Sequence, residues 1–97
     1  MIEYLYDAIR ASSGHDIEIG SMITDANQEL ITTGCSLVLH NPDFSELYVA
    51  SGEFQDFNSM WQFKIPADIT KGLRGRYWYC IRHNHDDLCF KQPIYLV

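Results

Sequence analysis

The feature of this sequence that most constrains its fold is a hydrophobic alternation with a period of two residues. Between residues 61 and 65, tryptophan, phenylalanine and isoleucine stand at every second position, and polar residues stand between them. Similar alternation runs through residues 17–23, 35–40 and 77–82. Successive side chains of a β-strand point to opposite faces, so this pattern predicts several half-buried strands. These segments are also rich in β-branched and aromatic residues, which suit a pleated sheet.

Turn-forming residues separate the alternating segments. Gly, Asn and Asp accept the backbone conformations of tight turns, and they recur here at intervals of about 8–12 residues, as in small β-sandwiches. The chain has 97 residues, of which 46% are hydrophobic, enough for one core. We therefore predict an all-β, immunoglobulin-like sandwich of about seven antiparallel strands, forming a single domain over residues 1–97. The turn segments are Ser12–Gly14, Asp25–Gln28, Thr33–Gly34, Asn41–Asp43, Asp56–Ser59 and Asn84–His85.

Two segments are less regular. Residues 2–10 fit either one face of a helix or a strand with bulky side chains on both faces, and we favour the strand. Residues 66–73 read as a long connection that contains one helical turn.

The last hairpin has a register that the side chains themselves indicate. A turn at Asn84–His85 folds residues 88–91 back onto residues 77–82. One face of this hairpin then pairs apolar residues and is predicted to belong to the core, while the other face pairs chemically complementary residues. The core pairs are Ile81 with Leu88 and Tyr79 with Phe90; the outer pairs are Arg82 with Asp87, Cys80 with Cys89 and Trp78 with Lys91.

The outer face of this hairpin is the candidate interaction surface. It carries Arg76, Trp78, Arg82 and Lys91, and aromatic residues beside arginines are typical of protein contact surfaces. The alternative is that the amino-terminal segment or a loop covers Trp78 within the same domain. Two routes to assembly follow from a sandwich with this face: pairing of the face with a second copy, and pairing at an open sheet edge.

The charge of the chain indicates which ligands are disfavoured, and its amino terminus and cysteines indicate where it is made and whether its thiols are reduced. Thirteen acidic residues against seven basic ones give a net charge of −6, which disfavours nucleic acid and anionic membranes as ligands. The amino terminus has neither the basic start nor the apolar stretch of a secretory signal, so we expect synthesis in the cytoplasm. The three cysteines, Cys35, Cys80 and Cys89, are accordingly expected to be reduced.

A polar cluster at residues 83–87 raises the question of a metal site. Histidine and aspartate are metal ligands, but the same residues are expected at a hairpin tip for turn reasons alone, and the turn interpretation is favoured. His15 and His40 stand apart from the cluster in the sequence. The weak candidate ligands are His83, His85, Asp86 and Asp87.

The sequence indicates a binding protein rather than an enzyme. It contains no nucleophile elbow and no glycine-rich phosphate loop, and we expect no catalytic residues and no cofactor. A thiol-based activity would require Cys80 to be exposed and reactive. A carbohydrate-binding module remains the alternative function, and it would need an exposed aromatic platform. Its candidate residues are Trp61, Trp78, Tyr48 and Phe57, of which Trp61 is expected in the core because it alternates with Phe63.

Several short motifs resemble one family of domains. The sequence reads aromatic-x-Phe-x-Ile-Pro at residues 61–66, continues with Asp68-Ile69-Thr70, and reads Gly-x-Tyr-x-Tyr at residues 75–79. These motifs, with the segments 14–17, 23–25 and 31–35, resemble small immunoglobulin-like domains of bacteriophage and prophage baseplate and tail-accessory proteins. The resemblance runs from about residue 12 onward.

The resemblance implies a non-catalytic structural or accessory protein. Its partners would be other phage structural proteins or a second copy of the chain, and it would be associated with the virion after cytoplasmic synthesis. Such domains commonly begin a longer protein, whereas this sequence ends at Val97. That difference favours a free-standing adaptor or decoration protein.

Overall fold

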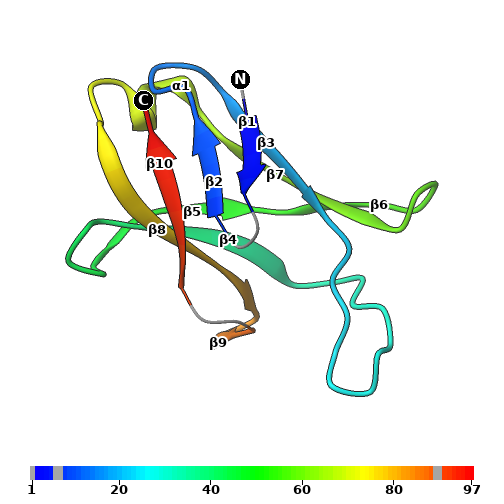
Figure 1. The fold of residues 1–97 in the computed structure, drawn as a ribbon. Helices are drawn as coiled ribbons and strands as arrows, with labels where there is room; N and C mark the ends of the chain where they lie inside the picture. Colours follow the sequence, from blue (N-terminus) through cyan, green and yellow to red (C-terminus); the bar gives the residue numbers. More distant parts are fainter. Residues whose placement is uncertain (1, 6–7, 89–90) are drawn as a thin grey trace.

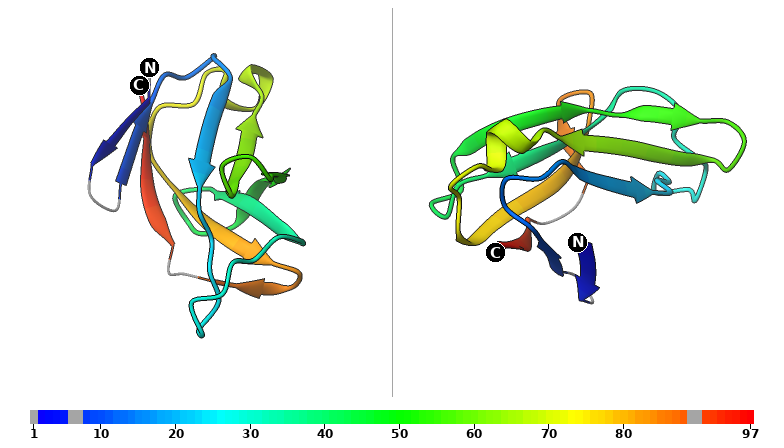
Figure 2. Two further views of the ribbon diagram at one scale, coloured as in Figure 1. Left: turned by 90° about the vertical axis from the view of Figure 1, so that its right-hand side faces the viewer. Right: turned by 90° about the horizontal axis from the view of Figure 1, so that it is seen from above.

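Two β-sheets pack face to face (Figure 1). Apolar side chains of both sheets form the core between them. The computed structural model describes residues 2–5, 8–88 and 91–97. Figure 2 shows the sandwich from two further sides, with both chain ends at the same end of the molecule. The predicted class, an all-β immunoglobulin-like sandwich, is confirmed. The elements are β1 (Ile2–Leu5), β2 (Ala8–Ala11), β3 (Ile17–Ser21), β4 (Cys35–His40), β5 (Glu46–Ser51), β6 (Glu53–Gln55), β7 (Met60–Ile65), α1 (Ala67–Thr70), β8 (Gly75–His83), β9 (Asp86–Asp87) and β10 (Gln92–Leu96).

The strands of the described residues divide unequally between the sheets. The large sheet has the order β1-β2-β10-β8-β4-β5, with β9 paired to β8, and the small sheet has the order β3-β7-β6. All pairs are antiparallel except β2 with β10, which run parallel. The strands outnumber the predicted seven in part because residues 46–55 form two strands, one in each sheet.

Gly52 lies where the chain crosses between the sheets. Its N–H donates to the Cys35 carbonyl at 3.0 Å. A Cβ atom at this position would lie 2.6 Å from side-chain atoms of Phe63 and of Trp61, so a side chain cannot fit without displacing the core.

The small sheet follows the predicted alternation. Along β7, Trp61, Phe63 and Ile65 are buried, and they pack against Ile17 and Ile19 of β3 in the common core. The residues between them face away from the core and are half-buried or exposed. The prediction that Trp61 belongs to the core is therefore confirmed, and its indole N–H donates to the Ile31 carbonyl at 2.7 Å.

Strand β4 of the large sheet is buried on both of its faces. Leu37 and Leu39 point into the core, as the alternation predicts. Val38 and His40 point to the other side of the sheet, yet they are also buried. The outer side of the large sheet therefore carries side chains that are closed off from solvent, which alternation alone did not predict.

The last hairpin corrects part of the predicted register. Arg82 pairs with Asp87 across the turn, as predicted. Tyr79 pairs with Gln92 instead of Phe90, and Trp78 pairs with Pro93 instead of Lys91, so the partner strand is displaced by two residues. In the structure β9 ends at Asp87, and a separate strand, β10, begins at Gln92. Cys89 and Phe90, the partners predicted for Cys80 and Tyr79, lie outside the described residues.

The assignment of faces on this hairpin is right for β8 but wrong for Leu88. Tyr79 and Ile81 pack against the core, as predicted. Leu88, predicted to join them, is 40% exposed, although its N–H donates to the Ile81 carbonyl at 2.8 Å.

The remaining segments agree with expectation. Residues 2–5 and 8–11 are strands rather than a helix. The connection after β7 contains the single turn α1. Among the described residues, no helix is long and apolar enough to cross a membrane.

Candidate functional site

The candidate site lies on the outer side of the large sheet. Arg76, Trp78, Cys80 and Arg82 alternate along β8 with the core-facing tyrosines and isoleucine, so all four point away from the core. The predicted surface residues of β8 therefore share one face. Lys91 joins them from the segment before β10, although not through the predicted pairing with Trp78.

Two aromatic rings form the centre of this face. The ring centroids of Phe44 and Trp78 lie 4.9 Å apart, and the rings are tilted by 39°. The Arg76 guanidinium lies 5.0 Å from the Trp78 ring, and the Lys91 ammonium lies 5.9 Å from the Phe44 ring. These separations are within the range of cation–π attraction. We call these four residues the Phe44–Trp78 patch.

Phe44 reaches the patch through a tight turn after β4. Its N–H donates to the Asn41 carbonyl at 2.9 Å. Asp43 accepts hydrogen bonds from the hydroxyl and the N–H of Ser45, at 2.6 and 3.1 Å, and these bonds lower the pKa of the Asp43 carboxyl. Phe44 itself has a φ of 70°, a left-handed conformation that is costly for a bulky residue. Even so, its side chain is 50% exposed.

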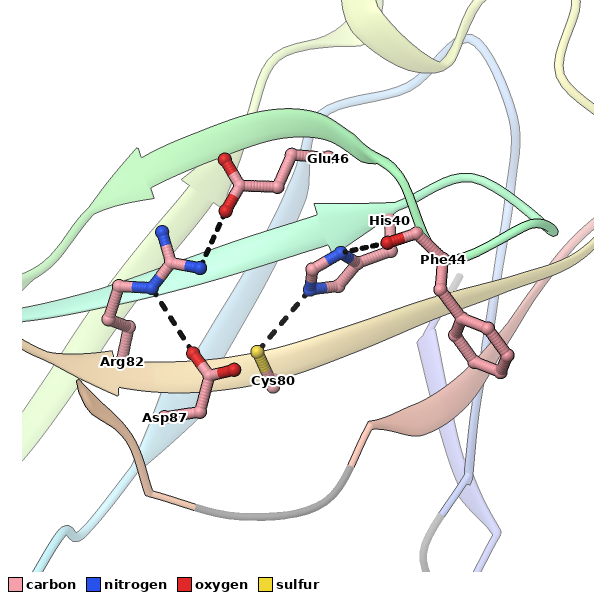
Figure 3. Close-up of polar contacts among 6 residues, drawn as sticks. All are labelled: His40, Phe44, Glu46, Cys80, Arg82 and Asp87. Carbon is pink, nitrogen blue, oxygen red and sulfur yellow. Dashed lines mark hydrogen bonds and ion pairs between the residues drawn. The ribbon is translucent and has the colours of Figure 1, made fainter. Parts of the chain in front are cut away.

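His40 stabilises this turn through a hydrogen bond to the Phe44 carbonyl. The ring is only 2% exposed. His40 Nδ1 lies 3.1 Å from the Phe44 carbonyl oxygen, and since a carbonyl only accepts, the proton is on Nδ1. Nε2 then faces Cys80 Sγ at 3.4 Å and can accept its S–H (Figure 3). Burial, and secondarily the charge of Lys91, lower the pKa of His40. The neutral imidazole thus connects the Phe44 turn to β8.

Arg82 lies at the other end of this outer face of the large sheet. Its guanidinium contacts the Glu46 carboxylate at 2.6 Å and the Asp87 carboxylate at 3.2 Å (Figure 3). These two partners raise the pKa of Arg82, and Arg82 in turn lowers the pKa of Asp87. Arg82 therefore links β5, β8 and β9, whereas Arg76 and Lys91 lie beside the aromatic rings.

The weak metal candidates lie on the β8–β9 hairpin and do not converge. Asp87 is directed to Arg82, and His85 and Asp86 are exposed. The N–H of Asn84 donates to the Gly34 carbonyl at 2.9 Å, and Asn84 has a φ of 56°, as expected of a turn residue. Among the residues that the structure describes, no three His, Cys, Asp or Glu side chains are grouped to hold a metal ion.

The residues proposed for sugar stacking are dispersed. Trp61 is buried, Tyr48 packs against the core, and Trp78 is partly covered by Phe44 and Arg76. Phe57 is 84% exposed at the turn between β6 and β7, on the small sheet. These four side chains do not form a common platform.

Two residues of this site were missed by the sequence reasoning. In the sequence His40 stands alone as a histidine, and no pattern gives Phe44 a role. The available signal was local: an Asn-Pro-Asp turn directly after a strand, followed by a lone aromatic residue. The contacts that make them important join residues far apart in the sequence, 40 apart for His40 and Cys80.

Comparison with known proteins supports the fold. No family model matches the chain, and no curated protein matches it in sequence. Among solved structures, the crystal structure of the Lin-41 filamin domain is similar, with a TM-score of 0.63 and 15% sequence identity. The similarity covers 91% of this chain and 82% of that one. The chain thus has the immunoglobulin-like sandwich fold of a filamin domain. At this identity the likeness concerns the fold alone.

Proposed function

We propose that this chain is a non-catalytic, protein-binding module that acts through the Phe44–Trp78 patch. The observation that carries the proposal is Phe44. A half-exposed aromatic side chain in a left-handed conformation, held by a buried histidine, costs stability and contributes little core burial. Strain of this kind is typical of positions retained for binding. The neighbouring tryptophan and the two cations have the composition of an interaction hot spot.

The experiment compares a double change in the patch with a single change of an exposed aromatic residue elsewhere. The chain and its variants are immobilised and incubated with lysate from the source organism, and the retained proteins are identified and purified. Binding of each purified protein is then measured by calorimetry. We expect a partner that binds the wild type and Phe57→Ala equally but loses at least about tenfold in affinity to the double variant Phe44→Ala, Trp78→Ala.

Phe57→Ala is the matched control because Phe57 is more exposed than Phe44 yet lies on the other sheet. Equal binding by both variants would contradict the proposal. A glycan array with the same proteins distinguishes the alternative: sugar binding lost with Phe44 and Trp78 would make carbohydrate the ligand of this patch.

Within this class, we propose a phage or prophage structural or accessory role, with association of the protein with the virion. The support is the motif resemblance at residues 61–66 and 75–79. The neighbouring genes test it. Tail or capsid genes on either side would support the role, and a neighbourhood without viral genes would contradict it.

A further inference from the structure

The outer face of the small sheet contains a groove, on the opposite side of the sandwich from the Phe44–Trp78 patch. It encloses about 460 Å³ beside the point where the chain crosses from β5 to β6. Glu18 of β3 and Glu53 of β6 supply two exposed carboxylates, and Gln55 and Gln62 supply two amides. We call it the Glu18–Glu53 groove.

The groove carries negative charge. Lys64 also lines it, but the Lys64 ammonium lies 3.3 Å from the Asp16 carboxylate, which offsets its charge. Glu18 and Glu53 form no ion pair with a described residue. The groove therefore presents two carboxylates that form no ion pair with a described residue. It also presents amide groups that can donate or accept hydrogen bonds.

On the opposite face, the Phe44–Trp78 patch carries two cations. The chain as a whole has a net charge of −6, with seven lysines and arginines. Four of these seven, Arg10, Arg76, Arg82 and Lys91, point to the outer side of the large sheet or lie over it. Arg82 is matched there by Glu46 and Asp87, whereas Arg76 and Lys91 form no ion pair with a described residue. A cationic and aromatic patch thus lies on one side of the sandwich, and an acidic groove lies on the other.

We propose that a second copy of this chain occupies each of these surfaces: the Phe44–Trp78 patch of one molecule docks into the Glu18–Glu53 groove of the next. The inference rests on the proposed function of the patch and names its partner. Arg76 and Lys91 face Glu18 and Glu53 across the contact, and the exposed Phe44 ring enters the groove. Complementary charge fixes the orientation of such a contact.

The contact joins two different surfaces, so it is heterologous. Each molecule keeps an unused patch at one end and an unused groove at the other. A heterologous contact closes into a ring or continues as an open chain, in contrast to the closed dimer that a symmetric contact produces. An interface of this type needs about 800 Å² per partner, roughly an eighth of the 6050 Å² surface of the chain.

The experiment uses two variants that each remove one surface. The patch variant carries Arg76→Gln and Lys91→Gln, and the groove variant carries Glu18→Gln and Glu53→Gln. Neutral replacements are used because reversed charges would create a new attraction between the variants. Molar mass is measured by light scattering between about 10 μM and 1 mM at about 50 mM salt, where charge contacts are weakly screened.

We expect the wild-type mass to rise with concentration above twice the 11.2 kDa of one chain. Each variant alone is expected to remain monomeric. An equal mixture of the two is expected to form a heterodimer and nothing larger, because only one intact patch and one intact groove are then complementary. Two control variants lose the same charge at exposed sites away from both surfaces, Lys71→Gln with Arg74→Gln and Glu29→Gln with Asp68→Asn. They are expected to assemble as the wild type does.

Three outcomes would overturn the inference. A monomeric wild type at about 1 mM would remove self-association altogether. A groove variant that still dimerises, while the patch variant does not, would show a symmetric contact through the patch. A mixture of the two variants that stays monomeric would show that the two surfaces do not bind each other. None of these outcomes decides the proposed function. That proposal is tested separately, by whether the binding of a different protein requires Phe44 and Trp78.

Discussion

On the small sheet most side chains that point away from the core are polar, whereas on the large sheet they include a buried histidine, a buried thiol and two contacting aromatic rings. Gln62 and Lys64 of β7 follow the simple rule that alternate residues of a strand face solvent. His40 and Cys80 break that rule, because the turn after β4 folds back over them. A sheet face that is closed by its own loop, with strain stored in that loop, is the face more suited to a specific function.

The largest expected effect is a loss of stability on the small sheet, where a core residue can be compared with its outward-facing neighbour. Phe63 is 1% exposed, and Phe63→Ala is expected to lower the free energy of unfolding by about 3–5 kcal/mol, through lost burial and the cavity left behind. Its neighbour Gln62 faces outward, and Gln62→Ala is expected to change stability by less than about 0.5 kcal/mol. Urea denaturation of both variants measures the difference. Similar losses for the two would mean that the outer face of the small sheet is not an ordinary polar face.

The small sheet is also the part of the fold that the sequence predicts best. The period-two pattern at residues 61–65 is sufficient to place Trp61, Phe63 and Ile65 in the core, because one face is buried and the other is not. On β8 the same pattern places Arg76, Trp78 and Arg82 on the outer face.

The pattern fails where structure depends on a loop. The pairing of Trp78 with Lys91 was wrong because side-chain complementarity alone does not show that β9 ends at Asp87 and that Trp78 pairs with Pro93 of β10. The roles of Phe44 and His40 depend on a turn that folds over a distant strand. No local periodicity encodes that contact.

A change at His40 tests whether the outer face of the large sheet is a second packed region. His40→Ala removes the donor to the Phe44 carbonyl and the group facing Cys80, and is expected to cost about 1–3 kcal/mol. Gln62→Ala is again the reference, since it changes an outward residue of the other sheet. A cost for His40→Ala as small as that of Gln62→Ala would remove the distinction between the two faces. Chemical denaturation followed by fluorescence measures both.

Two replacements of Phe44 separate backbone strain from side-chain contact. Glycine accepts a positive φ and alanine does not, so Phe44→Gly is expected to be more stable than Phe44→Ala by about 1 kcal/mol. Both remove the ring and should weaken partner binding equally. Thermal and urea unfolding give the order of stability. Alanine equal to or better than glycine would show that the turn is not strained and would weaken the argument that Phe44 is kept for binding.

The smallest expected effect is the pH dependence that His40 gives the large sheet. Its pKa is lowered from 6.5 in the folded protein, chiefly by burial, so the unfolded chain takes up a proton more readily. Stability from this group is therefore complete above about pH 6.5 and declines as the pH falls from there toward the folded-state pKa. Asp43 and Asp87, whose pKa values lie below 3.8, contribute losses only at more acidic pH.

His40→Gln isolates this effect because it replaces the imidazole with an amide that does not titrate. Other histidines and the acidic residues are common to both proteins and cancel in the comparison. We expect the unfolding free energy of the wild type to fall more than that of His40→Gln between about pH 7 and pH 5. The difference should be smaller than the cost of His40→Ala, since only a proton is added and the ring remains. Parallel pH profiles for the two proteins would mean that His40 is not held neutral under the Phe44 turn, and the outer face of the large sheet would then be as open to solvent as that of the small one.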